Sequence, residues 1–66
     1  MTPAVRDQLA AIARQHDMPI EVLHEEWAER AAIREYLGGM ARAKAEREAV
    51  GDACSMLGIA MQEEMP

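Results

Sequence analysis

Two adjacent glycines, Gly38 and Gly39, separate two long stretches of helical pattern, and this feature restricts the possible folds more than any other. Glycine often ends a helix because its backbone reaches the left-handed conformation without a steric penalty. A short connection of this kind typically joins two antiparallel helices. The sequence therefore predicts a helical hairpin, with helices over about 19–37 and 40–62.

A further helical pattern precedes the hairpin, over about 3–15. Thr2 can accept a hydrogen bond from a free N–H of the first turn, and Pro3 fixes a helical φ at the first position. The segment His16–Pro19 ends this pattern because a residue before proline is disfavoured in the α region. Apolar residues recur between these signals at helical spacing: Val5, Leu9, Ile12 and Ala13. We therefore expect one all-α domain over 1–66, a short N-terminal helix plus an antiparallel hairpin.

The small size of the chain indicates that it needs support beyond its own core. A domain of 66 residues buries only about 60% of the surface that its unfolded form exposes. The single cysteine, Cys54, cannot form an intramolecular disulfide, and the aromatic residues are Trp27 and Tyr36 alone. Oligomerisation is the remaining source of stability for a core this thin. The sequence therefore predicts a homodimeric helical bundle.

The helix expected over 40–62 carries an apolar seam of the coiled-coil type. At 100° per residue, five residues fall in one arc: Ala43, Val50, Cys54, Leu57 and Met61. Together with Trp27 of the preceding helix, we expect Val50, Cys54, Leu57 and Met61 to form the core or dimer seam. A ridge of small residues lies beside it: Gly51, Ser55 and Gly58. This ridge indicates either close approach by another helix or glycines that are simply tolerated.

The hairpin also predicts a register. Facing residues should have numbers that sum to about 77, since the turn lies at Gly38-Gly39. This places Trp27 near Val50, with Trp27 substantially buried. The same rule pairs two further sets, Leu23 with Cys54 and Ile20 with Leu57.

Charged residues interrupt the apolar arc of the helix expected over 19–37. The arc contains Ile20, Val22, Leu23, Trp27, Ile33 and Leu37, and Glu26, Arg30 and Arg34 lie inside it. One interpretation is that the aliphatic stems of these residues cover the core while their charged ends pair at i,i+4. The other is a charged patch at a subunit or partner interface, where arginine is enriched.

Tyr36 is the centre of the predicted partner-binding surface. It lies well away from Leu23 and Trp27 on the helical wheel, so the core has little use for it. We expect the surface to comprise Glu29, Arg30, Arg34 and Tyr36, near the tip of the hairpin. The alternative is an ordinary exposed tyrosine resting on its neighbours.

The segment from Glu29 to Ala49, ERAAIREYLGGMARAKAEREA, resembles a short module of phage and plasmid proteins, often replication proteins of the primase or helicase type. That module has the form ERAAIxEYxGGxxRxxAE. The resemblance covers about a third of the chain; it implies a helix-GG-helix hairpin and a mobile-element origin, but no role for individual residues. The module often carries a capping Ser where this chain has Ala41, so we expect Gly39 to serve as the cap instead.

The charge and the scarcity of reactive side chains exclude several classes of function. The net charge is −5 and the seven basic residues are interleaved with acids, which argues against nucleic acid as a partner. No run of 18 apolar residues occurs, and the N-terminus lacks a signal-peptide pattern, so we expect a cytoplasmic protein with no membrane partner. His16 and His24 are too far apart in the sequence to bind one metal ion, and we expect the Cys54 thiol to be buried. We therefore expect no metal, no cofactor and no enzymatic activity.

Three functions remain open from the sequence. The first is a dimeric protein of a phage or other mobile element that binds an unidentified host protein and inhibits or redirects it. The second is an accessory regulator of DNA transactions or transcription, with the hairpin acting as a helix-turn-helix. The third is an acidic antitoxin or nucleic-acid mimic, although arginines interrupt its acidic face.

Overall fold

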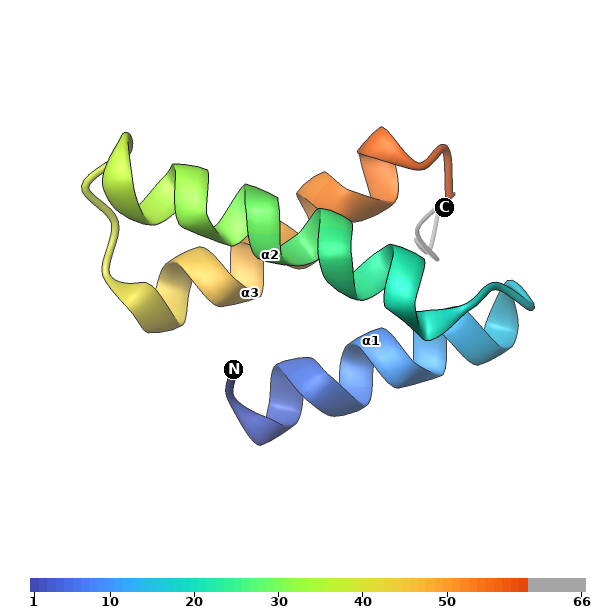
Figure 1. The fold of residues 1–66 in the computed structure, drawn as a ribbon. Helices are drawn as coiled ribbons and strands as arrows, with labels where there is room; N and C mark the ends of the chain where they lie inside the picture. The colour runs from blue at the N-terminus through green and yellow to red at the C-terminus, as the bar shows by residue number, and fades with distance from the viewer. Residues whose placement is uncertain (60–66) are drawn as a thin grey trace, which may run out of the picture.

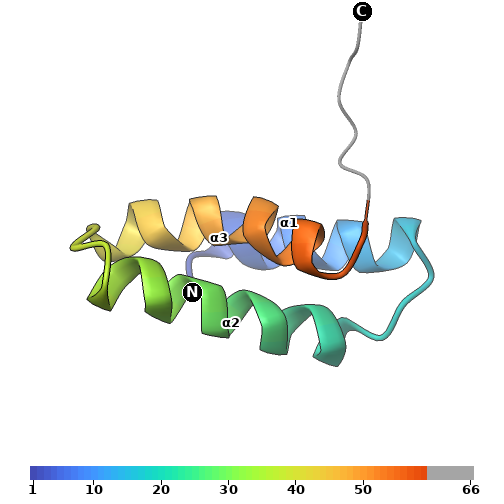
Figure 2. The same cartoon turned by 90° about the horizontal axis from the view of Figure 1, so that it is seen from above.

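The computed structural model describes residues 1–59, which form three helices and no strand. These are α1 (Pro3–Gln15), α2 (Ile20–Tyr36) and α3 (Arg42–Met56) (Figure 1). The helices α2 and α3 run antiparallel and form the closest pair, while α1 packs against both. Seen from above, α2 forms one layer, and α1 and α3 lie behind it (Figure 2). The predicted all-α class and the antiparallel hairpin are thus confirmed. None of these helices is long and apolar enough to cross a membrane.

The first helix begins as its sequence predicts. The Thr2 side chain accepts a hydrogen bond from the Val5 N–H at 3.3 Å, and Pro3 occupies the first helical position. At the other end, Asp17 has a φ of 51°, and the Met18 N–H donates to the Ala13 carbonyl at 3.0 Å. This left-handed residue closes α1 and turns the chain back toward α2.

The two glycines of the hairpin connection serve different purposes. Gly39 has a φ of +63°, a conformation that favours glycine. Gly38 is needed for space, since a Cβ there would lie 2.7 Å from the Arg34 carbonyl oxygen. The cap position of α3 is Ala41, which makes no side-chain hydrogen bond. The expectation that Gly39 caps this helix is therefore wrong, and α3 begins at Arg42 instead of residue 40.

The third helix also ends earlier than expected. It stops at Met56, and Gly58 follows with a φ of +71°. The N–H of Ile59 then donates to the Cys54 carbonyl at 2.8 Å, a bond that closes the last turn. The prediction that this helix extends to residue 62 is therefore wrong, because the chain leaves the helix before Gly58. Met61, the last member of the predicted seam, lies outside the described residues.

A single apolar cluster joins the three helices. Trp27 is 6% exposed, as predicted, and its indole N–H donates to the Glu46 backbone carbonyl at 2.9 Å. Cys54 is fully buried, and Leu57 packs against the cluster from its edge. The members of the cluster are Val5, Leu9, Ala13, Leu23, Trp27, Ala31, Ala49, Val50 and Ala53.

The broad apolar arc predicted for α2 is wrong. The helix buries only the stripe Leu23, Trp27 and Ala31. Leu37 is 83% exposed and lies just past the end of α2, as its C-cap residue. The remaining residues of the arc are also exposed: Ile20, Val22 and Ile33. On α3, the seam residue Ala43 is likewise exposed.

The predicted pairs of Leu23 with Cys54 and of Ile20 with Leu57 stay a prediction. Leu57 lines a groove with Val22, whereas Ile20 lines separate hollows. A Cβ at Gly51 would meet nothing within 4 Å among the described residues, so no helix of residues 1–59 approaches this glycine closely. Gly58 instead ends the helix.

Candidate protein-binding surface

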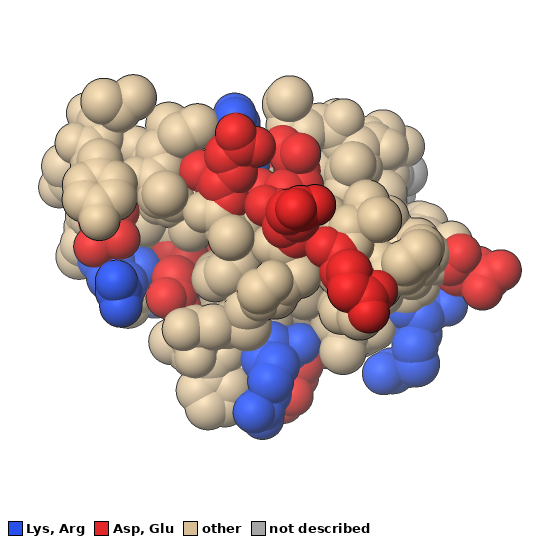
Figure 3. Space-filling model, viewed as in Figure 1, with Lys and Arg blue, Asp and Glu red and all other residues tan. Residues whose placement is uncertain are grey.

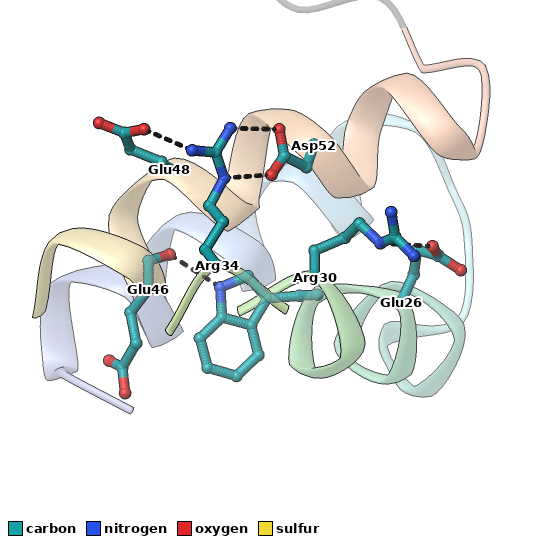
Figure 4. Close-up of polar contacts among 7 residues, drawn as sticks. Glu26, Arg30, Arg34, Glu46, Glu48 and Asp52 are labelled. Atoms are coloured by element: carbon teal, nitrogen blue, oxygen red, sulfur yellow. Dashed lines mark hydrogen bonds and ion pairs between the residues drawn. The ribbon is translucent and has the colours of Figure 1, made fainter. Parts of the chain in front are cut away.

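Arg34 connects the two helices of the hairpin. From α2, its Nε and Nη2 donate to the two carboxylate oxygens of Asp52 at 2.5 and 3.0 Å, and its Nη1 donates to Glu48 at 2.8 Å (Figure 4). Two parallel bonds of this kind are the strongest arrangement for an arginine and a carboxylate. The hydrogen bond from Arg34 lowers the pKa of Asp52, and the same bond raises the pKa of Arg34.

Arg30 pairs within its own helix. Its Nε lies 3.6 Å from Glu26 Oε2, at the i,i+4 spacing, and both side chains are about three-quarters buried. This contact confirms that Glu26 and Arg30 pair at i,i+4 spacing. Arg34 departs from that interpretation, because its partners come from α3. The Arg30 Nε is buried and makes no hydrogen bond among the described residues.

The four residues of the predicted partner surface do not form one surface. Arg34 faces α3, while Tyr36 lies about 160° away around α2 and is 78% exposed. Arg30 lies about 120° from Tyr36, and only Glu29 shares its side of the helix, about 20° away. The prediction took Arg30 and Arg34 as free to contact a partner, whereas carboxylates of α2 and α3 engage them.

The outer face of α2 is the side turned away from α1 and α3 (Figure 2). We define it by six residues that carry exposed or half-exposed side chains: Glu21, Val22, Glu25, Glu29, Ile33 and Tyr36. Three glutamates on it, Glu21, Glu25 and Glu29, repeat every four residues, and we refer to them as the acidic row. Within residues 1–59 they form no ion pair. Acidic side chains accordingly make a band across the middle of this face (Figure 3).

A shallow groove runs beside the acidic row. Val22, Glu25, Glu26 and Glu29 of α2 line it together with Leu57 of α3, and its volume is about 420 Å³. Val22 is 43% exposed, so the groove offers some apolar surface beside its carboxylates. We call it the Val22–Leu57 groove. Its carboxylates come from one helix, and only Glu26 is already paired, with Arg30.

Glu46 is a buried charge that the sequence pattern did not reveal. It is 6% exposed and is the one buried charged residue among those described. Its carboxylate accepts from the Thr2 N–H at 3.0 Å and lies 3.3 Å from the Met1 amino group. Glu46 sits within a run of charged residues, Arg42 to Glu48, and nothing in that run distinguishes it. It fastens the start of α1 to α3.

Two further side chains with reactive groups, Cys54 and His24, lie against other parts of the fold. Burial raises the pKa of the Cys54 thiol, which disfavours the reactive thiolate. The His24 ring lies 5.7 Å from the Trp27 ring, in a tilted arrangement. Across residues 1–59, no three His, Cys, Asp or Glu side chains converge as a metal site would require.

Comparison with known protein families, with curated proteins and with solved structures found no match.

Proposed function

We propose that this chain is a small protein of a phage or other mobile element that binds a host protein and inhibits or redirects it. In this proposal it works by contact and not by catalysis. One observation supports it above the others: the core uses only the Leu23, Trp27 and Ala31 stripe of α2. The outer face of the same helix is thereby left with unpaired carboxylates and exposed apolar side chains. The mobile-element origin rests on the resemblance of the segment Glu29 to Ala49.

The exposed Tyr36 makes the outer face suited to a protein partner. Tyrosine is enriched at interfaces because it adds a large apolar contact and a hydroxyl at a low entropic cost. Ile33 is 37% exposed one turn before it, so the two side chains extend one apolar area toward the hairpin tip. Neither residue belongs to the core cluster.

The experiment is capture from a bacterial lysate on the immobilised full chain, with bound proteins identified by mass spectrometry. We expect the double variant Tyr36→Ala, Glu29→Ala to lose the captured protein while its helical circular-dichroism signal and melting transition stay unchanged. The control is Asp7→Ala on α1, whose side chain is 76% exposed and far from the outer face in sequence. Capture that survives the double variant would place the binding surface elsewhere.

A second candidate function, an acidic antitoxin or nucleic-acid mimic, gains support from one feature. Arginines interrupt the acidic residues in the sequence, but Arg30 and Arg34 are engaged by Glu26, Glu48 and Asp52. The acidic row is therefore continuous, with a repeat of about 6 Å along the helix. Under this candidate, the captured host protein binds DNA, and duplex DNA added to the resin releases it. Retention at an excess of DNA would exclude mimicry.

We also propose that the chain acts as a homodimer. Large apolar side chains remain exposed on both hairpin helices and the turn, with Leu37 at 83% and Met56 at 58%. Covering them with a second copy would add the apolar burial that a chain of this size lacks.

A further inference from the structure

We infer that the outer face of α2 binds a basic amphipathic helix, one Lys or Arg of which lies in the Val22–Leu57 groove between Glu25 and Glu29. This inference rests on the proposed function, because it names the chemistry of the partner at the same surface. It goes beyond that proposal in assigning a charge, a conformation and one anchoring side chain to the partner.

The groove combines the two features that a long cationic side chain needs. Val22 of α2 and Leu57 of α3 are its apolar lining residues, and Glu25 and Glu29 line it beside them. The methylene stem of a lysine or arginine packs on apolar surface while its charged end stays at the polar edge. Glu25 and Glu29 have no ion pair within the described chain, so their oxygens are available to such an end.

The shape of the face favours a helical partner. The acidic row repeats every four residues, which is about 6 Å along the axis of α2. A second helix lying along α2 presents its own residues at i, i+4 and i+8 with the same repeat. Val22, Ile33 and Tyr36 supply exposed apolar contacts along the same side. A helix with one basic and apolar side therefore matches both sets of groups.

Charge distinguishes this occupant from two others. The end of the chain, residues 60–66, contains Glu63 and Glu64 and no Lys or Arg, so like charge opposes its docking on the acidic row. A second copy of the chain carries the same net charge of −5, which disfavours contact at the most acidic face. A basic segment of another protein has the complementary sign.

The test uses two synthetic helical peptides of about 18 residues, a length that covers α2. Both have the same leucine-rich side; one carries lysines at i, i+4 and i+8, and the other glutamines at those positions. Binding of each fluorescent peptide to the full-length chain is measured by anisotropy at low and moderate salt. We expect the lysine peptide to bind at least about tenfold more tightly, with affinity that falls as salt rises.

Two sets of variants locate the site. We expect Glu25→Gln with Glu29→Gln to weaken the lysine peptide about tenfold. The matched control, Asp7→Asn with Asp17→Asn, removes the same charge from exposed positions outside α2 and should change affinity less than about twofold. Val22→Ser should weaken binding without changing its salt dependence, because it removes apolar surface from the groove and no charge.

The outcomes separate this inference from the proposed function. Equal binding of the two peptides, or equal weakening by both double variants, would overturn the inference. If a host protein is then still captured in a Tyr36-dependent manner, the proposed function stands with a partner of different chemistry. If the lysine peptide binds as expected but no host protein is captured, the proposed function fails while the assigned chemistry of the face holds.

Discussion

At the scale of single residues, charged side chains connect elements that the apolar cluster packs together. Arg34 reaches from α2 to two carboxylates of α3, and Glu46 fastens the N-terminus of α1 to α3. Trp27 adds a hydrogen bond from its indole to the Glu46 carbonyl at 2.9 Å, in the middle of the apolar cluster. Since alanine supplies much of this cluster, directional polar contacts contribute to specifying how the helices face one another.

The Arg34–Asp52 contact predicts an acid-dependent loss of stability. Arg34 holds the pKa of Asp52 below its ordinary value of 3.8, so the contact stabilises the fold above that pH and is lost as pH falls through the folded pKa. We expect wild type to exceed Asp52→Asn in free energy of unfolding at about pH 6, and we expect this advantage to be smaller at about pH 2, because the contact weakens as the pH falls below 3.8. Urea unfolding followed by circular dichroism at both pH values measures the difference. An advantage of equal size at the two pH values would contradict the prediction.

At the scale of elements, the glycines of α3 and of the hairpin connection have different surroundings. Gly38 leaves room for the Arg34 carbonyl, whereas Gly51 lies inside α3 with open space around it. The helices begin and end where local signals place them: Thr2 and Pro3 start α1, and Gly58 ends α3. The side of each helix that becomes buried follows instead from its neighbours, which cover only a narrow stripe of α2.

Alanine substitution of these two glycines should have opposite effects. Gly51→Ala should stabilise the chain by about 0.5–1 kcal/mol, because alanine favours a helix and meets no neighbour. Gly38→Ala should destabilise it, since the added Cβ would lie 2.7 Å from a backbone oxygen. Thermal unfolding of both variants at equal concentration provides the comparison. A destabilised Gly51→Ala protein would indicate that another helix, absent from a single chain, approaches this glycine closely.

At the scale of the whole molecule, three helices form two layers (Figure 2). The core contains Leu9, Leu23 and Trp27 as its largest buried side chains, together with smaller residues. Leu37, Tyr36 and Met56 stay exposed beyond it. Leu37 lies at the hairpin turn and Met56 at the opposite end of α3, so a second copy that covers both would have to lie along the hairpin.

We expect light scattering on a size-exclusion column to give a mass near twice the 7.3 kDa of one chain at micromolar concentration. Leu37→Glu with Met56→Glu should shift the protein toward the monomer, because the change places charge among apolar contacts. The control, Gln8→Glu with Gln15→Glu, adds the same charge at exposed positions of α1 and should keep the wild-type mass. A folded wild-type monomer at this concentration would exclude the dimer.

The sequence alone determined which segments are helical, that Gly38 and Gly39 join two of them as an antiparallel hairpin, and that Trp27 is buried. These features follow from local chemistry: capping at Thr2, φ preferences of glycine and proline, and the 3.6-residue repeat. The tertiary structure decided which side of α2 is buried, that Arg34 pairs across to Asp52, and that Glu46 lies inside. A long charged side chain can reach solvent, its own helix or a neighbouring helix with similar ease. Only the position of the neighbouring helices selects among these partners. For this reason the acidic row could be recognised only in the structure, and the surface predicted around Tyr36 was not found there.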